Sequence, residues 1–236
     1  MITPRQNFVR LDIGKNSMGK TPTQIYDLIA YQRAFPKKKI IVSEGQDKFL
    51  DAHLRGHLRI DVLIPKNNKR WAAMLQEFKE PTPGNKVYTY ADSCLVIDDL
   101  KLLLTGSDTP ADFLGLFALR PSPKFNMDMM FNCHEPRNIM EGIAGYIDRY
   151  HIYANEAKAS QFEDKISCHF QCQRASLVIN KYEKLYPGHY DVRTHTPYFP
   201  HIVVEKDKPE PLHCVNMDYE KAKPILEEFT NKSQQS

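Results

Sequence analysis

The pattern of hydrophobic positions predicts strands that alternate with helices over roughly the first 155 residues. Between Thr21 and Pro36, apolar residues recur at intervals of three and four, which is the spacing of one helix face. Short apolar runs have the length of buried strands, and they lie at 8–13, 39–42, 94–97 and 127–132. Strands and helices in alternation indicate an α/β fold, with a mostly parallel central sheet and helices on both of its faces.

Further along the chain the pattern predicts four more helices and two more strands. The helices are expected at 109–120, 136–149, 158–185 and 219–229, and the strands at 150–153 and 201–205. The sequence changes character after residue 155, and residues 189–216 hold four prolines and scattered aromatic residues. We therefore expect a core at 1–155 and a C-terminal helical and irregular extension at 156–236, which either completes the core or forms an arm.

A motif for phosphate binding lies between the first expected strand and the first expected helix. Its residues are Gly14, Lys15, Asn16, Ser17, Met18, Gly19, Lys20 and Thr21, which fit the pattern G-x-x-x-x-G-K-[ST]. Glycines let the main chain wrap around phosphates, and the N–H groups at the start of the helix offer partial positive charge. We expect Lys20 to reach the β- and γ-phosphates of ATP, and the Thr21 hydroxyl to ligate Mg²⁺. The motif predicts a P-loop nucleoside triphosphatase.

An acidic pair supplies the second half of the expected site. Asp98 and Asp99 directly follow the apolar run at 94–97, which places them at the carboxyl end of a buried strand. Ligands bind at that edge of an open α/β sheet. We expect Asp98 to hold the magnesium ion together with Thr21. The residue that activates water is either Asp99, which we favour, or Glu44 at the end of the second expected strand.

Two more polar residues are candidates for catalysis. Asn132 ends the strand at 127–132, where a side-chain amide can sense the γ-phosphate and orient the attacking water. Arg120 ends the preceding helix, and in a ring of subunits it could stabilise charge on a neighbour's nucleotide as an arginine finger. A helix-terminal arginine is equally favoured by the helix dipole alone, so both interpretations of Arg120 stay open.

Composition bears on the cellular compartment and on possible partners, and it adds few candidate site residues. The net charge of +3 does not by itself argue for a nucleic-acid partner, although the cluster Lys37–Lys39 could contact DNA phosphates. The five cysteines include no C-x-x-C pair, and Cys168 and Cys172, four residues apart, supply too few ligands for zinc. With no signal-like start and no run of 18 apolar residues, we expect a cytoplasmic protein with no membrane span.

The order of these parts resembles the FtsK–HerA superfamily of ATP-driven DNA pumps, which includes phage genome-packaging ATPases and Zot-like proteins. The resemblance rests on Gly14–Thr21, Leu95–Asp99, the helix ending at Arg120, and Met127–Asn132 followed by His134-Glu135-Pro136. It implies an ATP-hydrolysing motor that moves or packages DNA as a homo-oligomeric ring. The chain departs from the family in having Asp99 where glutamate is usual and Asn132 where glutamine is commoner.

Two other classes of function remain as alternatives. A monomeric P-loop kinase or nucleotide-handling enzyme should carry several arginines in a lid, but after residue 155 the chain has only Arg174 and Arg193. A nucleotide-dependent switch of the ParA/MinD type is suggested by Lys15, five residues before Lys20. The D-x-x-G segment of that type is missing after Asp98.

Overall fold

The structure is a computed structural model of the chain. It describes residues 7–43, 47–64, 77, 88–100, 109–122, 125–139, 142–163, 166, 168–188, 190–191, 196–197 and 199–232. One of the candidate catalytic residues, Glu44, lies outside these ranges, and so does Arg193.

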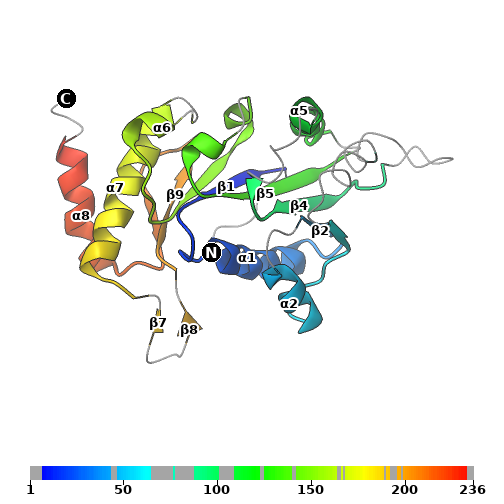
Figure 1. Ribbon diagram of the computed structural model, residues 1–236, viewed down its shortest axis with the longest axis horizontal. Coiled ribbons are helices and arrows are strands. Elements are labelled where there is room, and N and C mark those ends of the chain that lie inside the picture. The colour runs from blue at the N-terminus through cyan, green and yellow to red at the C-terminus, as the bar shows by residue number, and fades with distance from the viewer. Residues whose placement is uncertain are drawn as a thin grey trace.

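Strands and helices alternate through the first two thirds of the chain, as the sequence pattern predicts (Figure 1). The elements in chain order are β1 (Val9–Ile13), α1 (Lys20–Ala34), β2 (Lys39–Ser43), α2 (Lys48–Leu54), β3 (Val62–Ile64), β4 (Ser93–Ile97), α5 (Thr109–Leu119), β5 (Met127–Cys133), β6 (Arg149–Ile152), α6 (Ala159–Glu163), α7 (His169–Leu185), β7 (Tyr190–Asp191), β8 (Thr196–Pro197), β9 (His201–Glu205), β10 (His213–Val215) and α8 (Tyr219–Lys232).

The main sheet has eight strands in the order β10-β9-β6-β1-β5-β4-β2-β3. The six strands from β6 to β3 run parallel, whereas β9 runs antiparallel to β6 and β10 antiparallel to β9. Every residue of β1, β4 and β5 is buried, because these strands lie at the centre of the sheet with helices on both sides. The sequence-based expectation of a mostly parallel α/β sheet is confirmed.

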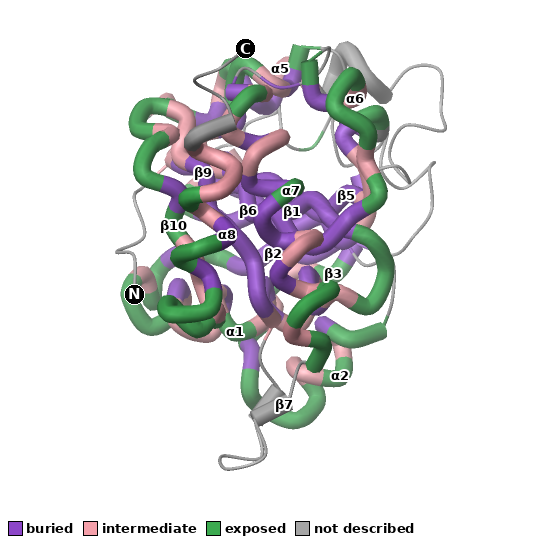
Figure 2. The backbone as a smooth tube through the Cα atoms, turned by 90° about the vertical axis from the view of Figure 1, so that its left-hand side faces the viewer, coloured by how far each residue is buried: buried purple, intermediate pink, exposed green. Residues whose placement is uncertain are grey.

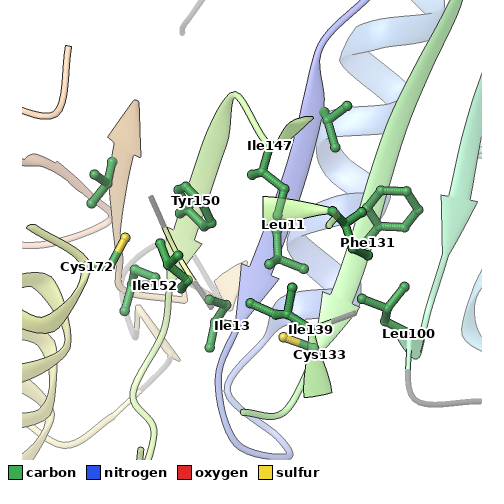
Figure 3. Close-up of a cluster of buried hydrophobic side chains, with 14 of the residues drawn as sticks. Leu11, Ile13, Leu100, Phe131, Cys133, Ile139, Ile147, Tyr150, Ile152 and Cys172 are labelled. Atoms are coloured by element: carbon green, nitrogen blue, oxygen red, sulfur yellow. The ribbon is translucent and has the colours of Figure 1, made fainter. Parts of the chain in front are cut away.

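Two hydrophobic clusters hold the helices to the two faces of the sheet. On one face, Leu11 and Phe131 of the central strands pack in the same cluster as Phe117 of α5, Cys172 of α7 and Ile225 of α8. Figure 3 shows part of this cluster, in which apolar side chains from adjacent strands point to the same side. On the opposite face, α1 and α2 cover the strands from β1 to β2, through residues that include Leu28, Tyr31, Val42, Phe49 and Met130. Figure 2 shows the buried centre of the molecule running through these strands.

The C-terminal residues complete this core. β9 and β10 add two strands to the main sheet beside β6, and α7 packs against β6, β9 and α8. The division into a core at 1–155 and an extension at 156–236 stays a prediction. Within the described residues, the chain has no helix long and apolar enough to cross a membrane.

Two expected helices differ from the structure. The helix expected over 136–149 is wrong: the chain forms two short 3₁₀ turns, Pro136–Asn138 and Ala144–Tyr146. Gly142 lies between them with a φ of 86°, a left-handed conformation that interrupts helical geometry. The stretch expected over 158–185 is divided into α6 and α7. Buried Phe162 and Ile166 keep helical spacing across the end of α6, so periodicity could not reveal the break.

Candidate nucleotide site

The phosphate-binding motif forms the loop between β1 and α1. The Gly14 N–H donates to the Cys133 carbonyl at 3.2 Å, and the Lys15 N–H donates to the Ala154 carbonyl at 3.0 Å. The loop is thereby fixed to the carboxyl ends of both strands that flank β1. A side chain at Gly14 would clash, because its Cβ would lie 2.6 Å from the Cβ of Tyr153.

Gly19 ends the loop in the left-handed conformation, with a φ of 85°. The ring of Phe199 packs directly on it, so that a Cβ at this position would lie 2.0 Å from a ring carbon. Ser17 also has a positive φ, of 64°. Left-handed residues alternating with ordinary ones turn successive N–H groups inward, which is the geometry of an anion-binding concavity.

Lys20 lies at the first position of α1 and is buried. Its ammonium group donates to the carbonyls of Gly14 and Lys15, the latter at 2.9 Å. Burial lowers the pKa of Lys20, and nearby acidic groups, including Asp12 and Asp98, oppose that shift. The ammonium group is therefore held at the loop by weak acceptors, which a phosphate anion would replace with stronger ones.

Three side chains predicted from the sequence converge beside the loop. The Thr21 hydroxyl donates to Asp98 Oδ1 at 2.7 Å, and Asn132 Nδ2 donates to the same oxygen at 2.9 Å. They come from the start of α1 and the carboxyl ends of β4 and β5, which meet at one edge because the strands are parallel and adjacent. The structure thus brings together Thr21, Asp98 and Asn132, while their roles in binding metal and phosphate stay predictions.

These residues fit a hydrated magnesium ion. Mg²⁺ prefers oxygen ligands, and at nucleotide sites it takes one or two from the protein and the rest from phosphates and water. Thr21 and Asp98 supply such a pair. Asn132 Oδ1 is buried with no hydrogen-bond partner among the described residues, so an acceptor is available for a water of the ion's shell. The described residues contain no cluster of three or more His, Cys, Asp or Glu side chains of the kind that holds a metal entirely by protein ligands.

Sequence reasoning missed His134 as part of the site. Its Nδ1 lies 3.5 Å from the ammonium nitrogen of Lys20, and its Nε2 lies 3.8 Å from Asp99 Oδ2. The imidazole therefore bridges the phosphate-binding lysine and the candidate base. The available signal was its place just beyond β5, at the same edge as Asn132. Burial raises the pKa of the neighbouring Cys133 thiol, which disfavours the thiolate that a nucleophile requires.

Two candidate side chains point away from this group. Arg120 follows α5, and its guanidinium donates to the carbonyls of Asn7 and Tyr146 and lies 3.5 Å from Asp148. Asn7 and Asp148 precede β1 and β6, so Arg120 lies at the amino edge of the sheet, opposite its own phosphate loop. The arginine-finger role of Arg120 stays a prediction. To reach the nucleotide of a neighbouring subunit, its guanidinium would have to break these hydrogen bonds. Lys15 is half exposed, with its ammonium group 4.0 Å from Glu156.

The lysine cluster considered for DNA contact divides into separate structural roles. Lys38 is buried and donates to Asp128 at 2.6 Å, and Lys39 donates to the Thr89 carbonyl at 2.8 Å. Lys37 alone of the three is exposed without such a contact in the described part of the chain. The cluster is therefore largely structural.

The strand, glycine-bounded loop and helix at one edge of a mostly parallel sheet, with an acidic residue at the end of a nearby strand, define the P-loop nucleoside triphosphatase fold. Among solved structures, the chain is similar to the genome-packaging NTPase B204 of Sulfolobus turreted icosahedral virus 2 in complex with ATP-gammaS. The TM-score is 0.56 at 12% identity, covering 88% of this chain and 96% of B204.

Two further solved structures have a similar fold. One is the pCW3 conjugation coupling protein TcpA with ATPgS (TM-score 0.53, 13% identity, 94% of this chain and 65% of that one). The other is the cytoplasmic domain of the type VII secretion ATPase EccC of Thermomonospora curvata (TM-score 0.51, 13% identity, 86% and 23%). This chain thus spans less than two thirds of either. No protein-family model and no curated protein sequence matches the chain.

Proposed function

We propose that the chain is a magnesium-dependent ATPase of the FtsK–HerA type. The observation that carries the proposal is the hydrogen-bonded group of Thr21, Asp98 and Asn132 directly beside the buried phosphate-loop lysine, Lys20. These side chains come from three separate elements, and together they supply the cation, the metal ligands and the polar sensor that phosphoryl transfer requires. Structural similarity to ATP-analogue complexes of B204 and TcpA supports the same assignment.

Catalysis in this proposal consists of positioning and charge stabilisation. Lys20 would leave the loop carbonyls to bind the β- and γ-phosphates, and Thr21 and Asp98 would hold the magnesium ion, which would supply charge neutralisation for the leaving phosphates. The free Oδ1 of Asn132 accepts a hydrogen bond from a water molecule. Asp99 accepts the proton of the attacking water. His134, whose Nε2 lies 3.8 Å from the Asp99 carboxylate, orients that water together with Asp99.

We further propose that the ATPase moves or packages DNA as a homo-oligomeric ring in the cytoplasm of a cell or host. Support comes from the fold, which is shared with a genome-packaging NTPase and a conjugation coupling protein. A kinase-type lid gains no support from Arg174, which pairs with Glu210. That pair lies among α7, α8 and the segment before β10, where the described C-terminal residues complete the sheet and its helical layer.

The test is ATP hydrolysis by the purified chain with and without DNA. Lys20→Ala should lower the rate at least about 100-fold, because it removes charge stabilisation of the transferring phosphoryl group. Lys37→Ala is the matched control: it removes an exposed lysine that lies outside the loop and has no side-chain contact among the described residues, and it should change the rate without DNA less than about threefold.

This assay tests the ATPase site and the DNA motor separately. Hydrolysis that survives Lys20→Ala would overturn the ATPase site. Lys20-dependent hydrolysis that neither double- nor single-stranded DNA stimulates would contradict the DNA motor while leaving the ATPase intact. Mass measurement of the chain with a non-hydrolysable ATP analogue should give a closed homo-oligomer, and a monomer under those conditions would count against the ring.

A further inference from the structure

A cavity of about 590 Å³ lies alongside α1, on the face of the sheet opposite α7 and α8. Its size is within the usual range for sites that bind small molecules. One wall is the face of α1 that carries Thr23, Asp27 and Ala30, and the other consists of residues from β1, β6, β9 and β10. The walls are mainly apolar and aromatic, and the aromatic members are Phe8, Tyr26, Tyr31 and Phe199.

The strands that form this wall carry polar residues on one face and apolar residues on the other. Register places Arg10 beside Arg149 and Asp12 beside His151, so these polar residues project to the α1 side. Leu11 and Ile152, at alternate positions, belong to the apolar cluster under the opposite helices. Three of the polar side chains are nevertheless buried: Arg10 is 3% exposed, Asp12 0% and His151 7%. A row of buried polar groups on one face of a sheet requires partners.

His151 lacks those partners. Both of its ring nitrogens are buried, and neither has a hydrogen-bond partner among the described residues. Burial lowers its pKa well below the usual value, and the positive charge of Arg10 adds to that shift, so the ring is neutral. A neutral imidazole has one N–H donor and one nitrogen acceptor. His151 lines the cavity and carries one unpaired donor and one unpaired acceptor, and leaving them unpaired is costly.

The charges around the cavity are already balanced. The Arg10 guanidinium forms ion pairs with Asp12 and Asp27, and Arg149 lies 3.0 Å from Glu205. A phosphate or carboxylate would meet two paired arginines and three carboxylates, so an anionic ligand is disfavoured. An uncharged ring suits the aromatic walls, where His201 stacks on His151 at 5.1 Å between ring centroids.

One end of the cavity adjoins the phosphate loop. Phe199 lines the cavity and also packs on Gly19, and Thr23 lines it from the first turn of α1. A ring at this end and a triphosphate in the loop would touch the same helix. We propose that the cavity binds a planar, uncharged heteroaromatic ring of the nucleobase class, whose donor and acceptor edge pairs with His151.

Such a ring has two possible sources. It is either the base of the nucleotide whose phosphates occupy the loop, a case that rests on the proposed function, or a separate nucleoside. The probes that distinguish them are tripolyphosphate, which has no base, adenosine, which has no phosphate, and ATP, each titrated with Mg²⁺ by calorimetry. Adenosine that competes with ATP indicates the first source, and adenosine that binds at saturating ATP indicates the second.

Two variants test the cavity itself. His151→Phe keeps a stacking ring but removes the donor and the acceptor, and it should weaken adenosine binding about tenfold, and ATP binding equally under the first source. Ala30→Trp fills the cavity from α1 and should weaken the same ligands while leaving His151 in place. Tripolyphosphate affinity should stay within about twofold in both variants, which shows that the fold and the loop are intact. His213→Phe, at an exposed histidine in β10, is the matched control for His151→Phe and should leave the affinities for all three ligands unchanged.

The outcomes of the two proposals are separable. Adenosine binding that both variants leave unchanged, or no adenosine and no base-dependent ATP binding in the wild type, overturns the cavity proposal, since His151 then pairs only with water. A failure of tripolyphosphate and ATP to bind overturns the ATPase site instead, and adenosine still tests the cavity. Loss of tripolyphosphate binding in both variants would contradict the proposed division between ring and phosphate sites.

Discussion

Acid should destabilise this fold through buried histidine, and His201 gives the best defined case. Its side chain is 1% exposed, and its Nδ1 pairs with the Phe199 carbonyl at 2.9 Å. Burial lowers the pKa of His201 from 6.5 to about 4. Between these two pH values the imidazole is protonated in the unfolded chain but not in the folded chain. The free energy of unfolding therefore decreases as the pH falls from 6.5 towards 4. The difference of about 2.5 between the two pKa values corresponds to roughly 3 kcal/mol.

The experiment compares urea unfolding of the wild type and His201→Phe between pH 7.5 and 4.5, followed by circular dichroism. At pH 7.5 the variant should lose about 1 kcal/mol for the missing hydrogen bond. At pH 4.5 it should be the more stable of the two, because it has no imidazole to protonate. The difference between the two proteins isolates His201, which matters because burial raises the pKa of Asp12 to about 6 and gives Asp12 the opposite pH dependence. A difference that does not change with pH would refute the reasoning.

Three other predictions address the remaining polar contacts. Lys38→Met should lower the free energy of unfolding, measured in urea, by about 3–5 kcal/mol, because it leaves the Asp128 carboxylate buried without its cation. The control Lys37→Met should lower it by less than about 0.5 kcal/mol. Gly19→Ala should abolish ATP binding in a filter assay, since residue 19 has a left-handed φ and an aromatic ring packed on it; retained binding would contradict this. His134→Ala should reduce the turnover number for ATP about 10- to 100-fold with little change in ATP affinity, and an unchanged turnover would exclude His134 from water orientation.

The parts of the site that could be predicted are those whose chemistry is encoded locally. Gly14, Lys20 and Thr21 lie within eight residues, and the motif predicts which of their atoms contact the phosphates. Asp98 could be placed because an apolar run ending in aspartate identifies a buried strand and its carboxyl end together. The sheet followed from the same alternation of runs, since parallel strands buried on both faces are predominantly apolar.

The parts that could not be predicted depend on residues distant in sequence. His134 became part of the site only when β4 and β5 were seen to be adjacent, which brings Asp99 within 3.8 Å of its ring. The cavity beside α1 needed the register of β1, β6 and β9, which joins residues near position 10 to residues near positions 150 and 200. A local signal did exist in β1, where Arg10 and Asp12 alternate with apolar residues. Alternation shows that one face is polar, but not what it faces.

The helix α1 belongs to both the candidate phosphate site and the cavity. Its first two residues, Lys20 and Thr21, belong to the phosphate site, and the face containing Asp27 and Ala30 forms a wall of the cavity. A helix is stiff along its axis, so any displacement of its start would also move the cavity wall. Asp27 is the point of contact, because its carboxylate pairs with Arg10 across the cavity floor. Occupancy of the cavity and the state of the nucleotide therefore act on one rigid element, and by linkage each should change the affinity for the other.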